Sequence, residues 1–339
     1  MSTLTPLTPG GSPASPAAFQ EELVWRVALY YKESHEPMSD GAFSALLEAV
    51  QEDLGPYLTH PSDIAFAKLA PVLDSYRQPH PEDEFLSNED YMATIAKRRD
   101  QVLAAAGHAL EIDPRCTDAL VVSALLQEDE TFEVVEALID LESQQLEGQE
   151  LHIPASGSAW DNVFARPALR HKAAIAFMAT EAAFYKRALT TAGQLLDLLP
   201  NDELGMRHTQ ALAFARLEDE TGFDELDARF HRRGSAWTNL ARTVMLFKLD
   251  RMPAARRALQ GFLSLNEGAA YALLHPVYVE PYLPLRPTFA PGSFEEVTLA
   301  VREADPLVVD VPEFITWVAN QPQVAEQAAS FAQSRGYDF

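Results

Sequence analysis

The segment RPALRHKAAIAFMATEAAFYKRALTTAGQLLDLLPNDELGMRH, from Arg166 to His208, begins the part of the chain in which helical periodicity becomes a repeat. Between Arg166 and Gly268, four or five helical stretches of similar length alternate with short turns. An amphipathic helix pair leaves one face uncovered, so it is stable only when a neighbouring pair packs on it. The segment therefore predicts an all-α fold built as a short stack of helix pairs.

Two turns in this region are alike, Leu199-Pro200-Asn201-Asp202 and Leu265-Asn266-Glu267-Gly268. Pro200 and Glu267 lie 67 residues apart, which is about twice the 34-residue period of one common helix-pair repeat. Thr221-Gly222-Phe223-Asp224 is expected to form a capping-box turn midway between them. Two stacked helix pairs fit this interval.

The rest of the chain divides into regions by composition and breaker residues. Five prolines between His275 and Pro291 disfavour helix and favour an extended segment. The predicted regions are residues 1–18 (a disordered tail), 19–85 (N-terminal helices), 86–147 (helix pairs of the same kind), 148–160 (a loop), 161–268 (the repeats) and 269–339 (the proline-rich segment and C-terminal helices).

Local signals place individual helices. Phe19, Leu23 and Val27 recur at spacings that lay an apolar stripe along one helix face. Ser87-Asn88-Glu89-Asp90 and Ser293-Phe294-Glu295-Glu296 have the pattern of capping boxes, in which a serine and an acidic residue three positions later satisfy free backbone amides. A helix is therefore expected to start at each of these sites.

Three segments resemble the tetratricopeptide proteins of the suppression-of-tumorigenicity (ST-seven) type and their bacterial relatives. They begin at Arg166, at Ser235 (SAWTNLARTVMLFKLDRMPAARRALQGFLSLNEG) and at Pro291 (PGSFEEVTLAVREADPLVVDVPEFITWV). The family's helix pair ends in a Leu-x-Pro-Asn-Asp turn followed by glycine and arginine, and a small residue stands twelve positions before the proline. The matching residues here are Pro200, Asn201, Asp202, Gly205, Arg207 and Ala188.

The resemblance implies a tetratricopeptide-like helical repeat, that is, a short solenoid or α-α superhelix, and it implies protein binding. It brings no reaction and no catalytic residue with it. The second turn of this chain lacks the family's proline.

Composition narrows the function classes. The chain has 50 acidic and 26 basic residues among 339 and a net charge of -24, which disfavours nucleic acid and anionic membrane surfaces as partners. Cys116 is the single cysteine, as is usual in a reducing compartment, and the uncharged N-terminus lacks the pattern of a secretory signal. The longest apolar run, Ala173 to Ala179, is shorter than the roughly 18 residues of a membrane span. We therefore expect a cytoplasmic protein.

Catalytic and metal-binding motifs are missing from the sequence. It has no His-Glu-x-x-His, no Gly-x-Ser-x-Gly, no phosphate loop and no Gly-x-Gly-x-x-Gly. No two of the nine histidines stand three or four residues apart as a helical metal site requires. Neither a catalytic residue, a metal nor a cofactor is predicted.

Charge is unevenly distributed along the chain. Residues 1–160 carry 28 acidic and 8 basic side chains, residues 161–268 carry 13 and 15, and residues 269–339 carry 9 and 3. Arg170, Arg207 and Arg242 lie 37 and 35 residues apart, about one repeat each. They are candidates for a row in a concave groove that clamps an acidic peptide or a C-terminal carboxylate, with Trp237 as an aromatic anchor. The alternative is that these arginines pair with the protein's own carboxylates and that the tryptophan belongs to the core.

The leading hypothesis is a scaffold that binds a protein or peptide. Two alternatives are left open. One is an enzyme whose site lies between the N-terminal helices and the repeats, and the other is a structural homo-oligomer, such as a homodimer formed through exposed end faces.

Overall fold

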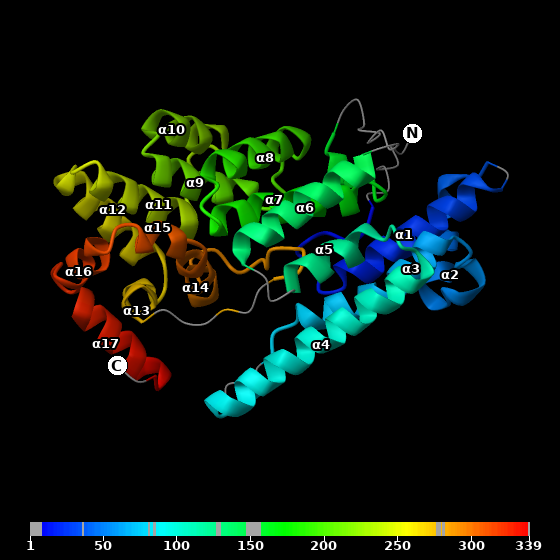
Figure 1. Cartoon of the computed structure of the whole chain (residues 1–339), viewed down its shortest axis with the longest axis horizontal. Helices are drawn as coiled ribbons and strands as arrows, with labels where there is room; N and C mark the ends of the chain where they lie inside the picture. Colours follow the sequence, from blue (N-terminus) through cyan, green and yellow to red (C-terminus); the bar gives the residue numbers. More distant parts are fainter. Residues whose placement is uncertain are drawn as a thin grey trace. The chain divides into compact units, whose positions relative to one another are not determined.

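The computed structural model describes residues 9–35, 37–80, 82–83, 86–126, 130–146, 157–275, 279 and 282–337 of the chain. These residues form seventeen α-helices and contain no β-strand, so the all-α prediction is confirmed (Figure 1). The chain divides into two compact units, and the repeat region predicted for residues 161–268 contributes to both. The first unit is Met1–Ile175, Asp197–Leu204 and Tyr282–Pro287, and the second is Ala176–Leu196, Gly205–Pro281 and Thr288–Phe339.

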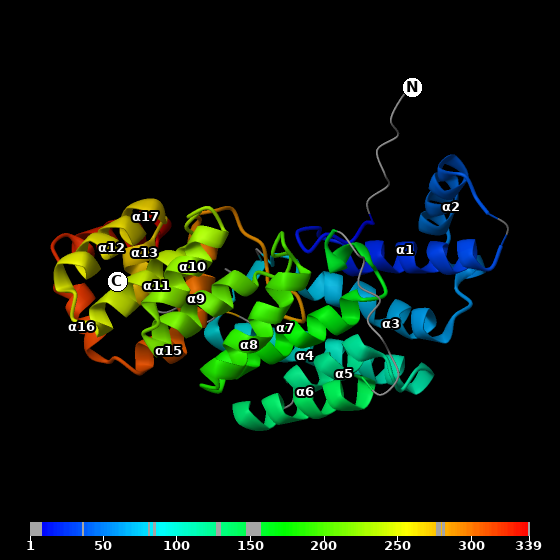
Figure 2. The same cartoon turned by 90° about the horizontal axis from the view of Figure 1, so that it is seen from above.

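In the first unit, helices that follow one another along the chain pack on one another. Helix α1 packs on α2 and α3, α3 packs on α4, α4 on α5, and α5 on α6 (Figures 1 and 2). The elements of this unit are α1 (Ala18–Glu33), α2 (Asp40–Glu52), η1 (Gly55–Tyr57), α3 (Pro61–Tyr76), α4 (Asn88–Ile112), α5 (Thr117–Leu126), α6 (Thr131–Leu146), η3 (Ala159–Asp161) and the first part of α7 (Arg166–Glu181).

The apolar stripe predicted for α1 forms part of the core of this unit. Phe19, Leu23 and Val27 are all buried, and the ring of Phe19 meets that of Phe66 on α3 edge to face with 6.3 Å between centroids. Burial of one such side chain stabilises the fold by about 1.5–3 kcal/mol. The predicted cap of α4 is also present, because the Ser87 hydroxyl accepts a hydrogen bond from the backbone N–H three residues later.

In the second unit, two helix pairs stand next to each other. Helix α9 packs on α10 and α11 packs on α12, and the two first helices, α9 and α11, are also in contact (Figure 2). The helices of this unit are the end of α7, most of α8 (Tyr185–Leu198), α9 (Met206–Leu217), α10 (Glu220–Arg229), α11 (Ala236–Lys248), α12 (Met252–Leu265), α13 (Ala269–Leu274), α14 (Phe294–Glu303), α15 (Asp305–Val309), α16 (Glu313–Ala319) and α17 (Val324–Arg335).

Helices α7, α9 and α11 end in the same way. Ala183, Glu218 and Asp250 have φ angles of 61°, 59° and 54°, and the backbone N–H of each donates to the carbonyl three residues earlier. The next N–H donates to the carbonyl five residues earlier, which completes a Schellman motif each time. These positions lie 35 and 32 residues apart, and the same motif also ends α10, where His231 has a φ angle of 57°.

Two sequence predictions differ from the structure. Thr221 to Asp224 lie inside α10, and the turn comes earlier because Asp219 caps that helix by accepting the Gly222 N–H at 2.9 Å. The segment predicted as a disordered tail is held in place from residue 9 onward, because Arg166 donates to the carbonyl oxygens of Gly10 and Gly11. Residues 1–8 of that predicted tail, and residues 148–156 of the predicted loop, lie outside the described residues.

The predicted helix start at Ser293 is confirmed, since its hydroxyl accepts the backbone N–H of Glu296 at 3.2 Å. Helix α16 (Glu313–Ala319) is one of the helices in the C-terminal region predicted for residues 269–339. No helix in the described part of the chain combines the length and the apolar character that crossing a bilayer requires.

Candidate functional site

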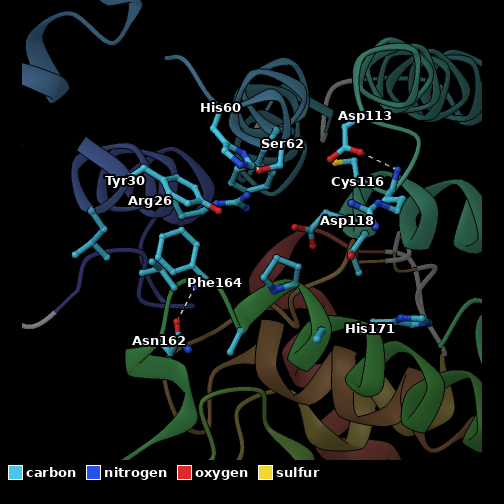
Figure 3. Close-up of a pocket in the computed structure, with 18 of the residues that line it drawn as sticks. Arg26, Tyr30, His60, Ser62, Asp113, Cys116, Asp118, Asn162, Phe164 and His171 are labelled. Atoms are coloured by element: carbon cyan, nitrogen blue, oxygen red, sulfur yellow. Dashed lines mark hydrogen bonds between the residues drawn. The ribbon is translucent and has the colours of Figure 1, made fainter. Parts of the chain in front are cut away.

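A cavity of about 990 Å³ opens in the first unit (Figure 3). Its wall is formed by the second half of α1, the start of α3, the turn between α4 and α5, a side chain of α6, residues 161–165 and the first turns of α7. The volume lies at the upper end of the range of about 300–1,000 Å³ that is typical of ligand pockets. We take this cavity as the candidate functional site.

A buried arginine holds three helices of this unit together beside the cavity. Arg170 on α7 donates to both carboxylate oxygens of Glu22 on α1, at 2.7 and 3.0 Å. It also donates to both oxygens of Asp118 on α5, at 2.7 and 2.6 Å. Burial alone would lower the pKa of Arg170, but the carboxylates of Asp118 and Glu22 outweigh that effect and raise the pKa above its usual value. The guanidinium therefore stays charged.

A second buried pair joins α1 to α3. Arg26 places Nη2 2.9 Å from Oδ1 of Asp63 and Nη1 3.9 Å from Oε1 of Glu22. Neither oxygen of Asp63 accepts a well-aligned hydrogen bond within the described part of the chain. Burial raises the pKa of Asp63, and the neighbouring Arg26 only partly opposes this.

Arg166 at the start of α7 completes the ionic group. Its guanidinium lies 3.7 Å from Glu22 and 4.9 Å from the centre of the Trp160 ring, and its Nε donates to the carbonyl oxygen of Trp160 at 2.8 Å. Burial lowers the pKa of Arg166 to about 10, so it is still a cation at neutral pH.

We call Arg26, Arg166, Arg170, Glu22, Asp63 and Asp118 the buried ion network. Its three cations balance its three anions, and all six side chains are buried. Breaking such a network costs far more than rearranging exposed charges. Because Arg26 and Asp118 also line the cavity, part of its wall is fixed before any ligand arrives.

Aromatic rings form another part of the wall. The ring of Tyr30 is stacked on that of His60 with 4.5 Å between centroids and lies 4.7 Å from that of Phe164 (Figure 3). Phe164 and His60 are exposed. An exposed ring on a cavity wall offers apolar contact area and a π-face to a ligand.

The His60–Ser62 pair and Cys116 are the groups in the cavity whose chemistry could support catalysis. Nδ1 of His60 lies 2.8 Å from Oγ of Ser62, which is within reach for a base and a nucleophile. However, the adjacent carboxylate of Asp63 accepts no hydrogen bond within the described residues, so it does not orient the imidazole as a triad requires. Burial raises the pKa of the Cys116 thiol to about 11, so this thiol is not an activated nucleophile.

The structure places the four predicted site residues in different settings. Arg170 does not line an open groove, because it is 1% exposed and is paired within the buried ion network. Trp237 is 3% exposed, and its indole N–H donates to Glu303 at 2.7 Å. For both side chains the alternative interpretation holds: Arg170 pairs with the protein's own carboxylates, and Trp237 belongs to the core.

The other two predicted residues belong to the second unit, whereas Arg170 belongs to the first. Arg242 is partly exposed and pairs with Asp227 at 2.9 Å and with Asp224 at 3.3 Å. The guanidinium of Arg207 lies 5.4 Å from the centre of the Phe230 ring. Acidic and aromatic side chains of the same unit therefore already contact these two guanidinium groups.

The cavity residues were not predicted as a site, but one signal in the sequence points to them. Glu22 and Arg26 are four residues apart and are interspersed with Phe19, Leu23 and Val27 on the core-facing side of α1. Two opposite charges on the buried face of a helix indicate partners elsewhere in the fold.

The described residues contain no group of three or more His, Cys, Asp or Glu side chains placed to hold a metal ion. Comparison of the chain with protein-family models, with curated proteins and with solved structures gives no match.

Proposed function

We propose that this chain is a binding protein and that the cavity of the first unit holds a segment of a partner protein. The observation that carries the proposal is the cavity of about 990 Å³, with exposed aromatic rings on one part of its wall and the buried ion network behind another. A wall that is ordered before binding lowers the entropic cost of association.

The second unit suits a scaffold of the tetratricopeptide type. Support comes from the two helix pairs whose first helices touch and from the Schellman motifs at Ala183, Glu218 and Asp250. Their spacings of 35 and 32 residues bracket the period of about 34 that defines such repeats. Kinship with the ST-seven type of tetratricopeptide protein is part of this proposal, and so is a cytoplasmic location, which suits the single cysteine.

A cavity-filling substitution tests the binding role. Ala168 lines the cavity on α7, so Ala168→Trp should fill part of it. We expect members of a displayed library of random peptides to bind the native protein and to lose binding to this variant. Ala93→Trp is the matched control, since Ala93 is exposed on α4 and does not line the cavity.

Circular dichroism and thermal unfolding should show that both variants fold like the native protein. If no library peptide binds the native protein, or if the Ala93→Trp control loses binding as much as Ala168→Trp does, the proposed function is wrong. The homodimer stays a prediction, which light scattering at several protein concentrations decides.

A further inference from the structure

The cavity carries an excess of negative charge after its internal ion pairs are counted. Five carboxylates and three basic side chains line it. Two of the carboxylates are already paired, Asp118 with Arg170 and Glu142 with Lys172. Arg26, one of the three basic side chains, is itself paired with Asp63.

Three carboxylates remain, Glu33, Asp113 and Asp161, and they face one remaining basic side chain, Arg115. None of these four forms an ion pair within the described part of the chain. Three negative charges against one positive charge leave a surplus of two negative charges. A ligand that supplies cationic groups would balance it, whereas an acidic ligand would add to it.

Part of the surplus lies beside the aromatic rings. Glu33 follows Tyr30 by three residues in α1, so the two side chains share one face of that helix. Both residues line the cavity from the last turns of α1. A carboxylate next to exposed rings is a suitable setting for an ammonium or guanidinium group, because the charge and the π-face both attract it.

We infer that the cavity of the first unit takes a basic peptide segment. One or two lysine or arginine side chains of the segment balance the carboxylates of Glu33, Asp113 and Asp161. The inference rests on the proposed binding function and adds the chemical class of the partner. It reverses the preference for an acidic partner that the three arginines suggested, because Arg170 is neutralised inside the protein.

Isothermal titration calorimetry with two end-capped peptides, tetralysine and tetraglutamate, tests the inference. We expect tetralysine to bind with a stoichiometry of one and tetraglutamate to give no signal. The double variant Glu33→Gln, Asp161→Asn removes two exposed carboxylates and should weaken tetralysine binding on the order of tenfold, as the loss of two exposed ion pairs together would. Higher salt should also weaken binding.

The whole chain carries a charge of -24, so a matched control is essential. Glu48→Gln, Asp100→Asn removes two exposed carboxylates of the same unit that do not line the cavity. This control should change the affinity less than twofold. An equal loss in both double variants would overturn the inference by showing general attraction to the surface, and tighter binding of tetraglutamate would overturn it as well.

The result is separable from the proposed function. Some library peptides that bind the native protein but not the Ala168→Trp variant could lack lysine and arginine. Such peptides would refute the charge inference, but they would still support the proposed binding function. Thermal unfolding of each variant shows whether a lost signal reflects lost binding or lost structure.

Discussion

Arg170 and Asp118 form a doubly hydrogen-bonded ion pair inside the first unit, with Nη2 of Arg170 2.6 Å from Oδ2 of Asp118 and Nε 2.7 Å from Oδ1. The two residues lie 52 positions apart in the chain. Because the same guanidinium also holds Glu22, one side chain ties α1, α5 and α7 to one another.

The first prediction concerns this arginine. Arg170→Met should destabilise the protein by about 3–5 kcal/mol, since it leaves the carboxylates of Glu22 and Asp118 buried without this counter-ion. Arg242→Met is the control, because it removes a partly exposed pair with Asp224 and Asp227 and should cost about 1 kcal/mol or less. Urea unfolding followed by circular dichroism measures both. A similar loss in the free energy of unfolding for the two variants would contradict the structure.

The second prediction compares two tryptophans of the second unit. Trp237→Phe removes the donor to the buried carboxylate of Glu303 and should cost about 1–3 kcal/mol. The indole N–H of Trp317 is buried and has no acceptor within the described residues, so Trp317→Phe loses no hydrogen bond. We expect the Trp237 variant to have the lower thermal midpoint, and the reverse order would refute the assignment.

The third prediction is a pH dependence from His171. Burial lowers the pKa of His171 below its ordinary value of 6.5, while its Nε2 contacts the carbonyl oxygen of Leu138 at 2.8 Å. Below that ordinary value the unfolded chain binds the proton more readily than the folded chain does. The contribution of neutral His171 to the free energy of unfolding is therefore complete above about pH 6.5 and is lost as the pH falls further.

His171→Gln should flatten the loss of stability between about pH 7.5 and 5.5 relative to the native protein. Urea midpoints at four or five pH values measure the slope. His108→Gln, on the exposed side of α4, should leave the slope as it is. A slope that is the same in all three proteins would show that His171 does not titrate as the structure implies.

The fourth prediction concerns the thiol on the cavity wall. Burial, followed by the carboxylate of Asp118, raises the pKa of Cys116 from 9.0 to about 11, which reduces its thiolate roughly a hundredfold near pH 8. Cys116 is the only cysteine, so a colourimetric disulfide reagent reports on it alone. Labelling should be slow in the native protein and fast in urea. Fast labelling of the native protein would mean that the thiol is neither buried nor protonated.

Much of the helical pattern could be predicted from the sequence, because local signals specify it. The stripe of α1 and the serine caps at Ser87 and Ser293 depend on residues close together in the chain. Short helices without such signals were missed. Helix α13 has only six residues, all apolar or small, so no periodicity can show in it. Helix α17 begins after Gln323, which has a left-handed backbone and no side-chain cap.

The candidate site could not be predicted in the same way. Arg170 and Glu22 are 148 residues apart, and no rule of spacing connects them. The similar spacings of Arg170, Arg207 and Arg242 suggested equivalent positions, but Arg170 is buried while Arg242 is partly exposed. Identical residue types at one repeat's distance therefore do not share an environment when the packing around each repeat differs.

The contacts of Gly10 and Gly11 with Arg166 have a practical consequence for anyone who produces this protein. A truncation that starts the chain at Ala18, the first residue of α1, would remove this segment. It would remove the two carbonyl oxygens that Arg166 contacts, and the one of Gly11 also accepts from the Trp160 indole N–H at 3.3 Å. The shortened protein would then expose a guanidinium and an indole that residues 10 and 11 otherwise cover.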